Sequence, residues 1–255
     1  YWDAVFALFS DASSASYINL FLVSLKASNT QIGFLATLIQ ILTALAPLPG
    51  AMVAERSGRY RANILAPAVI ARMGWFALAA MPFLPLGPAA ITAAIAIFGL
   101  RAFLMSWLSA PWTAFVGKLV PARLRSGYFA MRNFGGGIAT IAGTLLAGQI
   151  ISSLGAPQGY QLIFLISGIA GLAATWVFMR IPFKDEAAPN ASPASRTSMF
   201  SNARALMRDN PRYARYLVCN CALALAVGIG GPFIQVYQVR ELGFTAGVIG
   251  LLASV

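Results

Sequence analysis

The sequence predicts an all-α polytopic membrane protein, and three observations support that fold class. Of the 255 residues, 59% are hydrophobic and only 10% are charged, whereas soluble domains average roughly 25% charged residues. The mean hydropathy is +0.74. Four stretches contain no charged residue, and each is longer than the roughly 20 residues that cross a bilayer core as a helix. These stretches are 27–54, 73–100, 133–179 and 216–239.

The first four helices are bounded by charged residues or by a turn rich in proline and glycine. Each is long enough to cross the hydrocarbon core. They are predicted at 4–25, which ends before Lys26; at 30–53, which ends before Glu55; at 63–83, which follows Arg61; and at 89–116, which ends before Lys118.

The remaining helices follow the same logic. The stretch 133–179 is long enough to cross twice, with a turn at 155–157. Asp209 or Asn210, followed by Pro211, fits the cap and first-turn proline of another helix. These four helices are predicted at 128–153, 160–181, 213–239 and 245–255. The last covers only about 16 Å, so we expect seven full helices, the start of an eighth and further C-terminal helices of the same protein.

The net charge of +11 is explained by basic residues that cluster between the apolar spans. Pairs of apolar spans separate three basic clusters, so all three are expected on one side of the membrane. The positive-inside rule makes that side cytoplasmic. We therefore expect an integral protein of a bacterial cytoplasmic (inner) membrane, in contact with the lipid bilayer and with no nucleic-acid partner. The clusters are Arg56, Arg59 and Arg61; Lys118, Arg123, Arg125 and Arg132; and seven residues within 180–215.

Enzymatic and metal chemistry find no support in the residue types. The chain has no histidine, and its two cysteines, Cys219 and Cys221, point to different faces of one predicted helix. A zinc or haem site would therefore lack ligands. There is also no nucleophile beside a base and no phosphate-binding loop. We expect no catalytic residues, no metal and no cofactor.

A polar segment between Pro182 and Pro211 divides the apolar helices into two sets. It is rich in alanine, proline, serine and asparagine and carries both signs of charge, as a linker does. We expect three parts: a six-helix transmembrane bundle at 1–181, a cytoplasmic linker at 182–212, and the start of an incomplete C-terminal bundle at 213–255.

This organisation resembles the major facilitator superfamily of transporters, and the loop after the 30–53 helix carries the most specific match. The family pattern there is Gly, three residues, Asp, a base, any residue, Gly, Arg and a further base. Glu55, Arg56, Gly58 and Arg59 fall in register. The departures are Ala51 for glycine, Glu55 for aspartate and Tyr60 for the last base. The resemblance implies a twelve-helix bundle in which these four residues form a gating loop between the two halves.

A second family feature is absent. The helix at 128–153 lacks the Gly-Pro pair of proton-driven drug exporters. It has instead small residues at spacing four, which permit close approach of another helix. In the resembling family this helix packs against the eighth helix, predicted here at 245–255, across the two halves. The stripe consists of Gly135, Ala139, Gly143 and Ala147.

Charged residues inside a span are costly and mark a cavity or a partner. Asp11, Arg72 and Arg101 are the deep ones. Asp11 shares one polar arc of its helix with Ser14 and Tyr17. By depth along straight helices, counted at about 1.5 Å per residue, Arg72 is the better partner for Asp11. By lateral position in the resembling fold, Arg101 is better, so both pairings stay open.

Uncharged polar side chains complete the candidate site. Gln40 lies on the second predicted helix, and Asn220 and Gln235 share a face of the 213–239 helix, which the sequence at 228–232 interrupts. A broken helix can expose backbone groups to a solute. Helix packing explains these side chains about as well as solute binding does.

The sequence therefore favours a secondary active transporter of a small, polar or anionic organic solute, working by alternating access and coupled to an ion, the proton first. Asp11 would be the protonatable coupling group and Arg101 the solute anchor, with Ser14, Tyr17, Gln40, Asn220 and Gln235 around the solute. The alternative is a protein of the same fold without a solute cycle, serving as an assembly factor, as a subunit of a membrane complex or as a lipid transporter.

Overall fold

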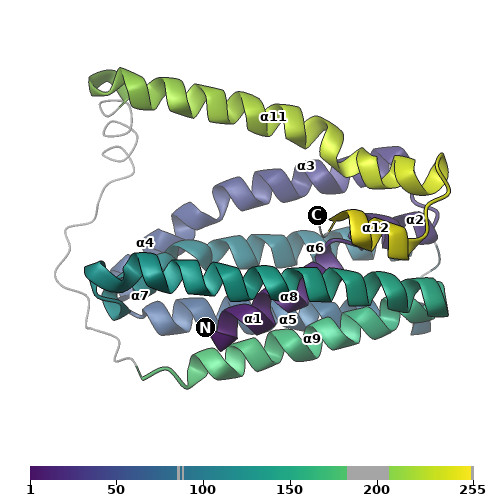
Figure 1. The fold of residues 1–255 in the computed structure, drawn as a ribbon, viewed down its shortest axis with the longest axis horizontal. Helices are drawn as coiled ribbons and strands as arrows, with labels where there is room; N and C mark the ends of the chain where they lie inside the picture. The colour runs from purple at the N-terminus through teal and green to yellow at the C-terminus, as the bar shows by residue number, and fades with distance from the viewer. Residues whose placement is uncertain (85–86, 88, 183–206, 254–255) are drawn as a thin grey trace.

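The computed structural model describes residues 1–84, 87, 89–182 and 207–253, without the side chains of residues 229, 230, 232 and 235. Within these residues the regular structure is helical and contains no strand, which confirms the all-α class (Figure 1). The elements are α1 (Trp2–Ala15), α2 (Ile18–Ser24), α3 (Asn29–Leu45), α4 (Pro47–Ser57), α5 (Tyr60–Ala80), η1 (Met81–Phe83), α6 (Ala89–Trp107), α7 (Ser109–Leu119), η2 (Ala122–Leu124), α8 (Arg125–Leu154), α9 (Gln158–Met179), α11 (Pro211–Arg240) and α12 (Ala246–Ala253).

Six segments of the described chain are long and apolar enough to cross a membrane, and they match the first six predicted helices within a few residues. Where the seventh was predicted, α11 forms one continuous 30-residue helix, so the interruption expected at 228–232 does not form. α11 is not among those six segments. Asn210 precedes α11 and Pro211 opens it, as predicted, but the Asn210 side chain makes no capping hydrogen bond. The six segments are Trp2–Ser24, Asn29–Ser57, Tyr60–Phe83, Ala89–Leu119, Ala122–Leu154 and Gln158–Met179.

Three of the predicted continuous helices are broken in the middle. The α3/α4 break lies at Ala46, directly before Pro47, and the α6/α7 break at Leu108, three residues before Pro111. A proline has no N–H, so Pro111 leaves the carbonyl of Trp107 without its helical donor. Gly50 of α4 packs on that carbonyl, and a Cβ atom there would lie 2.2 Å from the oxygen. The α1/α2 break near Tyr17 has no proline.

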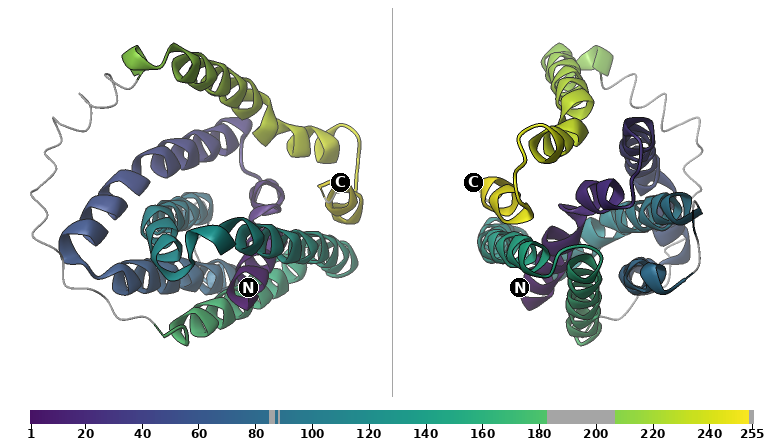
Figure 2. Two further views of the ribbon diagram at one scale, coloured as in Figure 1. Left: turned by 60° about the vertical axis from the view of Figure 1, so that its left-hand side comes forward. Right: turned by 90° about the vertical axis from the view of Figure 1, so that its right-hand side faces the viewer.

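α1 lies at the centre of the bundle and packs between α8 and α9 (Figure 2). α5 packs against α9 and α6, and α3 against α6. Aromatic side chains of α5 and α9 pack beside α2, the second half of the segment Trp2–Ser24. Trp75 stacks on Phe164 with 5.6 Å between ring centroids, and Phe21 meets Phe164 edge-on at 5.0 Å. Close packing of these rings contributes to the association of α2, α5 and α9.

The predicted small-residue stripe of α8 faces α1. Gly143 lies so close to Phe9 that a Cβ atom would be 3.0 Å from the Phe9 carbonyl oxygen. α12 packs on a neighbouring face of α8, where the backbone N–H of Gly247 donates to Ser152 Oγ at 3.1 Å. α8 and α12 are therefore in contact, as the family resemblance implied. The residues of α8 that meet α12 are Gly148 and Ser152, which lie on the face next to the small-residue stripe.

The two ends of the bundle differ in charge and in contact. α4 and α7 end, and α8 and α11 begin, at the same end (Figure 1). There Arg61 donates to the Met179 carbonyl, and Lys118 Nζ lies 4.6 Å from the Tyr60 ring. At the opposite end, Arg240 of α11 donates to Asn29 Oδ1 at 2.6 Å and to the Ala27 carbonyl at 3.0 Å. α11 is thus tied to the start of α3 at that end.

Candidate functional site

An ion pair joins α1 to α6 inside the bundle. Arg101 Nη2 contacts Asp11 Oδ1, and the Arg101 side chain is 7% exposed whereas that of Asp11 is 36% exposed. The carboxylate therefore faces open space on one side while its partner is enclosed by protein. Of the two pairings that the sequence left open, the structure forms Asp11 with Arg101.

The depth estimate favoured Arg72 because it treated 89–116 as one straight helix. The break at Leu108 separates α6 from α7, so a count of residues along one straight helix no longer measures the depth of Arg101. α1 packs on α8 and α9 rather than directly on α6, so the pairing is made by the Arg101 side chain, which reaches from α6 to the Asp11 carboxylate.

The guanidinium of Arg101 is held by an aromatic wall. Its Cζ lies 3.9 Å from the centroid of the Trp75 ring and 5.9 Å from that of Phe98. Stacking of this kind stabilises a desolvated cation. Arg101 Nε is buried without a hydrogen-bond partner among the described atoms. The Arg101 guanidinium is thus neutralised by the Asp11 carboxylate and positioned by the Trp75 ring.

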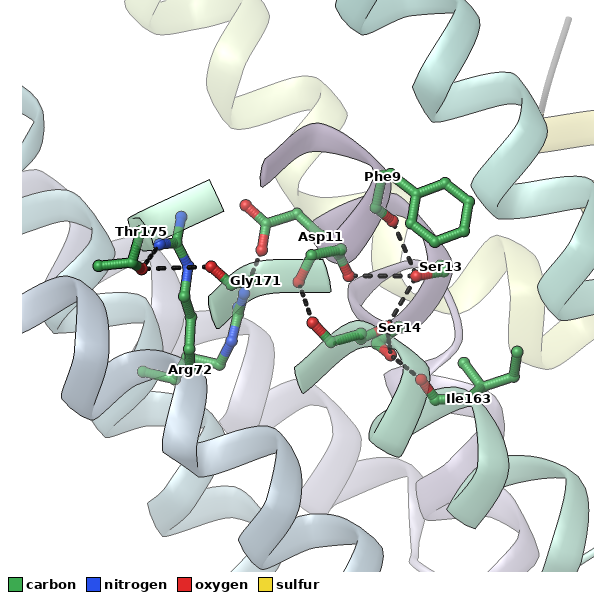
Figure 3. A network of polar contacts seen from close by, with 11 residues as sticks. Phe9, Asp11, Ser13, Ser14, Arg72, Ile163, Gly171 and Thr175 are labelled. Atoms are coloured by element: carbon green, nitrogen blue, oxygen red, sulfur yellow. Dashed lines mark hydrogen bonds and ion pairs between the residues drawn. The ribbon is translucent and has the colours of Figure 1, made fainter. Parts of the chain in front are cut away.

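Arg72 lies on α5 and has a different partner. Its guanidinium donates to Thr175 Oγ1 of α9, and that hydroxyl donates in turn to the Gly171 carbonyl at 3.2 Å (Figure 3). Arg72 is 8% exposed. No carboxylate of the described chain lies within ion-pair distance of it.

A cavity of about 350 Å³ lies beside Asp11 and Arg72. It is enclosed by α1, α5, α9 and the α6/α7 break, and Asp11 and Arg72 both line it, whereas Arg101 does not. Arg132 of α8 lines the same cavity with its Cζ 4.4 Å from the Trp112 ring centroid. The volume lies in the range of small-ligand sites.

Ser14 is fully buried between α1 and α9. Three serines of α1 converge on Ser167 of α9: Ser14 Oγ donates to Ser167 Oγ at 2.5 Å, Ser13 Oγ lies 2.7 Å from it, and Ser10 Oγ donates to the Ser167 carbonyl at 2.6 Å (Figure 3). Each hydroxyl has a partner, so α9 supplies hydrogen-bonding groups for the polar face of α1. Ser14 does not line the cavity beside Asp11 and Arg72.

Tyr17 is also enclosed, at 1% exposure. Its hydroxyl donates to the Thr144 carbonyl of α8 at 2.7 Å. A Cβ atom at Gly148 or Gly250 would lie within 2.7 Å of that hydroxyl. Tyr17 thus lies at the junction of α1, α8 and α12, where it contacts both halves of the chain.

Gln40 lines a second cavity, of about 770 Å³, between α3 and α11. Thr37 lines it from the same helix, and Ala224 and Gly228 line it from α11. Asn220 lies one turn before Ala224, is exposed, and donates to the Tyr216 hydroxyl at 3.3 Å. The Gln235 side chain lies outside the described residues. The structure thus separates the charged pair from the uncharged polar groups.

The proposed gating loop is a sharp turn at the end of α4. Gly58 has φ 64° and ψ −1°, the left-handed conformation that glycine adopts without a Cβ clash. Asn63 Nδ2 donates to Ser57 Oγ at 3.0 Å and holds the turn. Glu55, Arg56 and Arg59 are exposed, and none forms an ion pair within the described chain.

Sequence reasoning missed the contribution of α9 and of Trp75. Thr175, Gly171 and Ser167 recur at spacing four on the apolar helix, and this spacing would have placed a polar stripe against α1. Within the described residues no group of three or more histidine, cysteine or acidic side chains could hold a metal ion. Cys219 and Cys221 are free and exposed.

The fold and the site together define a polytopic helical membrane protein with a buried ion pair and polar cavities in its interior. A model of the family described as Major Facilitator Superfamily matches residues 4–255. The chain belongs to the major facilitator superfamily, a family of membrane transporters. No curated protein sequence matches it significantly.

Proposed function

We propose that this chain forms part of a secondary active transporter that moves a small polar or anionic organic solute by alternating access, driven by protons. The observation that carries the proposal is the Asp11 and Arg101 pair. A carboxylate that is one-third exposed beside a cavity, opposite an enclosed guanidinium, can take a proton from water without moving the cation.

Protonation of Asp11 would weaken its hold on Arg101. A buried cation without its partner carries a large desolvation cost, so the protonated state favours any arrangement that supplies Arg101 with a new acceptor. The solute or a rearranged helix can supply it. Arg101 is therefore assigned to coupling first, and to solute contact when Asp11 releases it.

The solute path is assigned to the space between α3 and α11, around Gln40. The hydrogen-bonding side chains there, Gln40 and Thr37, are uncharged and suit a polar solute. In this proposal residues 1–181 and 213–255 belong to the two moving halves and 182–212 to a cytoplasmic linker. Positive charge places the Gly58 turn on the cytoplasmic side, in a bacterial inner membrane.

Alternating access needs contacts that hold one end closed while the other opens. The end at Arg240 is held by its bonds to Asn29 and Ala27 and by the packing of α12 on α8. At the other end, Glu55, Arg56 and Arg59 would supply the opposing contacts when the halves close there.

The first test is ligand-induced thermal stabilisation of the full-length protein in detergent, screened across sugars, organic acids, amino acids and organic cations at two pH values. Binding to the folded state raises the melting temperature by an amount that grows with the ratio of ligand concentration to Kd. We expect a hit whose shift is lost in Gln40→Ala and retained in Ser153→Ala, which removes an exposed hydroxyl of α8. Absence of any hit would favour the assembly or lipid function over solute transport.

A further inference from the structure

The interior of the described bundle carries more positive than negative charge. Three arginines, Arg72, Arg101 and Arg132, lie around the cavity and the ion pair, against two carboxylates, Asp3 and Asp11. Asp11 pairs with Arg101, and Asp3 lies 3.4 Å from the N-terminal ammonium group of Tyr1. Arg72 and Arg132 therefore have no carboxylate partner among the described residues, and Arg72 is the more enclosed of the two.

A guanidinium inside a membrane protein without an anion is energetically unfavourable. Arg72 has five N–H donors, and the described contact is to one uncharged acceptor, the Thr175 hydroxyl. That bond satisfies a donor but not the charge. The fold thus keeps a cation at the wall of a cavity in a position where an anion would be stabilised.

Arg72 is held in place by the shape of α9. Its side-chain stem crosses α9 at Gly171, where a Cβ atom would lie 2.9 Å from Arg72 Cγ and 3.0 Å from Cδ. Any larger residue would displace the stem. Together with the Thr175 contact, this close approach fixes the guanidinium against the cavity before any ligand arrives, which lowers the entropic cost of binding.

Apart from Asp3, Asp11 and the hydroxyls of Ser109, Thr113 and Thr175, the remaining walls of the cavity are largely apolar. Leu8, Ile64, Met105 and Phe178 line it. A second cation, Arg132, stacks on Trp112, and its Nε is buried without a partner in the described chain. A ligand that fits these walls has one anionic group and an apolar body.

We propose that this cavity is a binding site for an organic carboxylate with an apolar body, whose carboxylate is bound by Arg72. An arginine can hold both carboxylate oxygens through two parallel N–H bonds. The site lies inside the α1, α5 and α9 part of the bundle and is distinct from the space around Gln40. It goes beyond the proposed function, because it requires a bound carboxylate whether or not that carboxylate is the transported solute.

The test measures equilibrium binding of radiolabelled benzoate to the full-length protein in detergent, with benzamide as the neutral analogue of the same shape. Binding to empty micelles is subtracted. The variants are Arg72→Gln, Arg72→Lys and, as the control for loss of one positive charge, Arg123→Gln, whose side chain is exposed on η2.

We expect wild-type protein and Arg123→Gln to bind benzoate with similar affinity, and benzamide at least about tenfold more weakly. Arg72→Gln should raise the Kd for benzoate about tenfold or more, and Arg72→Lys should give an intermediate value because lysine lacks the two-pronged geometry. The Kd for benzamide should not change.

Equal affinity for benzoate and benzamide, no benzoate binding at millimolar concentration, or an unchanged Kd in Arg72→Gln would each overturn the proposal. If Arg72→Gln does not fold, Gly171→Ala takes its place, since it displaces the same side chain without removing the charge; unchanged benzoate binding there counts equally against the site. Proton-driven uptake is a separate measurement, so loss of this site leaves the proposed transport function standing.

Discussion

Breaking the Asp11 and Arg101 pair from its two sides should have unequal costs. Asp11→Ala leaves the Arg101 guanidinium, 7% exposed, without a carboxylate. Removing one partner of a buried pair costs about 3 to 5 kcal/mol, and the lower value applies because the Trp75 ring still stabilises the cation at 3.9 Å. We therefore expect a loss of about 3 kcal/mol in the free energy of unfolding.

Arg101→Met should cost less. The Asp11 side chain is 36% exposed and can be hydrated, and methionine replaces the cation with an apolar group that packs on Trp75. We expect a loss of about 1 kcal/mol. The double variant should lie close to Arg101→Met, since it leaves no unpaired buried charge, which gives a coupling energy of about 2 to 3 kcal/mol.

The assay is reversible unfolding of the full-length protein in mixed SDS micelles, with all four members of the double-mutant cycle measured under one condition. Arg123→Gln serves as a control for net charge. A coupling energy below about 0.5 kcal/mol, or an Arg101→Met loss equal to that of Asp11→Ala, would refute the reasoning that the enclosed cation depends on the carboxylate.

Three further changes test the packing around the site. Gly171→Ala should cost about 1 to 3 kcal/mol of unfolding free energy, because its Cβ meets Arg72. Ser167→Ala should cost about 1 kcal/mol, because Ser13 and Ser14 lose their shared partner but keep the Phe9 and Ile163 carbonyls as acceptors. Gly58→Ala should cost about 1 kcal/mol, since its φ of 64° is unfavourable for alanine.

The same unfolding assay checks all three changes, with a matched control for the first. Gly137→Ala, where a Cβ atom meets nothing within 4 Å, should be neutral or stabilising, because alanine favours helix over glycine. A Gly171→Ala variant as stable as Gly137→Ala, an undisturbed Ser167→Ala, or a Gly58→Ala variant at wild-type stability would each contradict the contact assigned to that residue.

The number and positions of the first six spans were predictable, because hydropathy and charge gaps depend only on local sequence. The breaks were predictable only in part. Pro47 and Pro111 are visible in the sequence and remove helical donors, whereas the break near Tyr17 has no such residue and follows from packing on α8 and α12.

The partner of Asp11 was not predictable from depth. Arg72 and Arg101 lie on different helices, and which of them reaches Asp11 depends on the arrangement of the whole bundle. The polar arc of α1 was identified correctly as a set of residues, but a helical face does not state what covers it. α9 covers Ser14 with Ser167, so the hydroxyls bond to protein.

The most direct test of the transport proposal compares two modes of uptake in proteoliposomes containing the full-length protein and the solute identified by the thermal screen. One is accumulation driven by an imposed pH gradient, and the other is exchange of labelled for unlabelled solute without a gradient. We expect wild-type protein to perform both, and Asp11→Asn to retain exchange while losing gradient-driven accumulation. Accumulation by Asp11→Asn at the wild-type level would contradict the assignment of Asp11 as the coupling group.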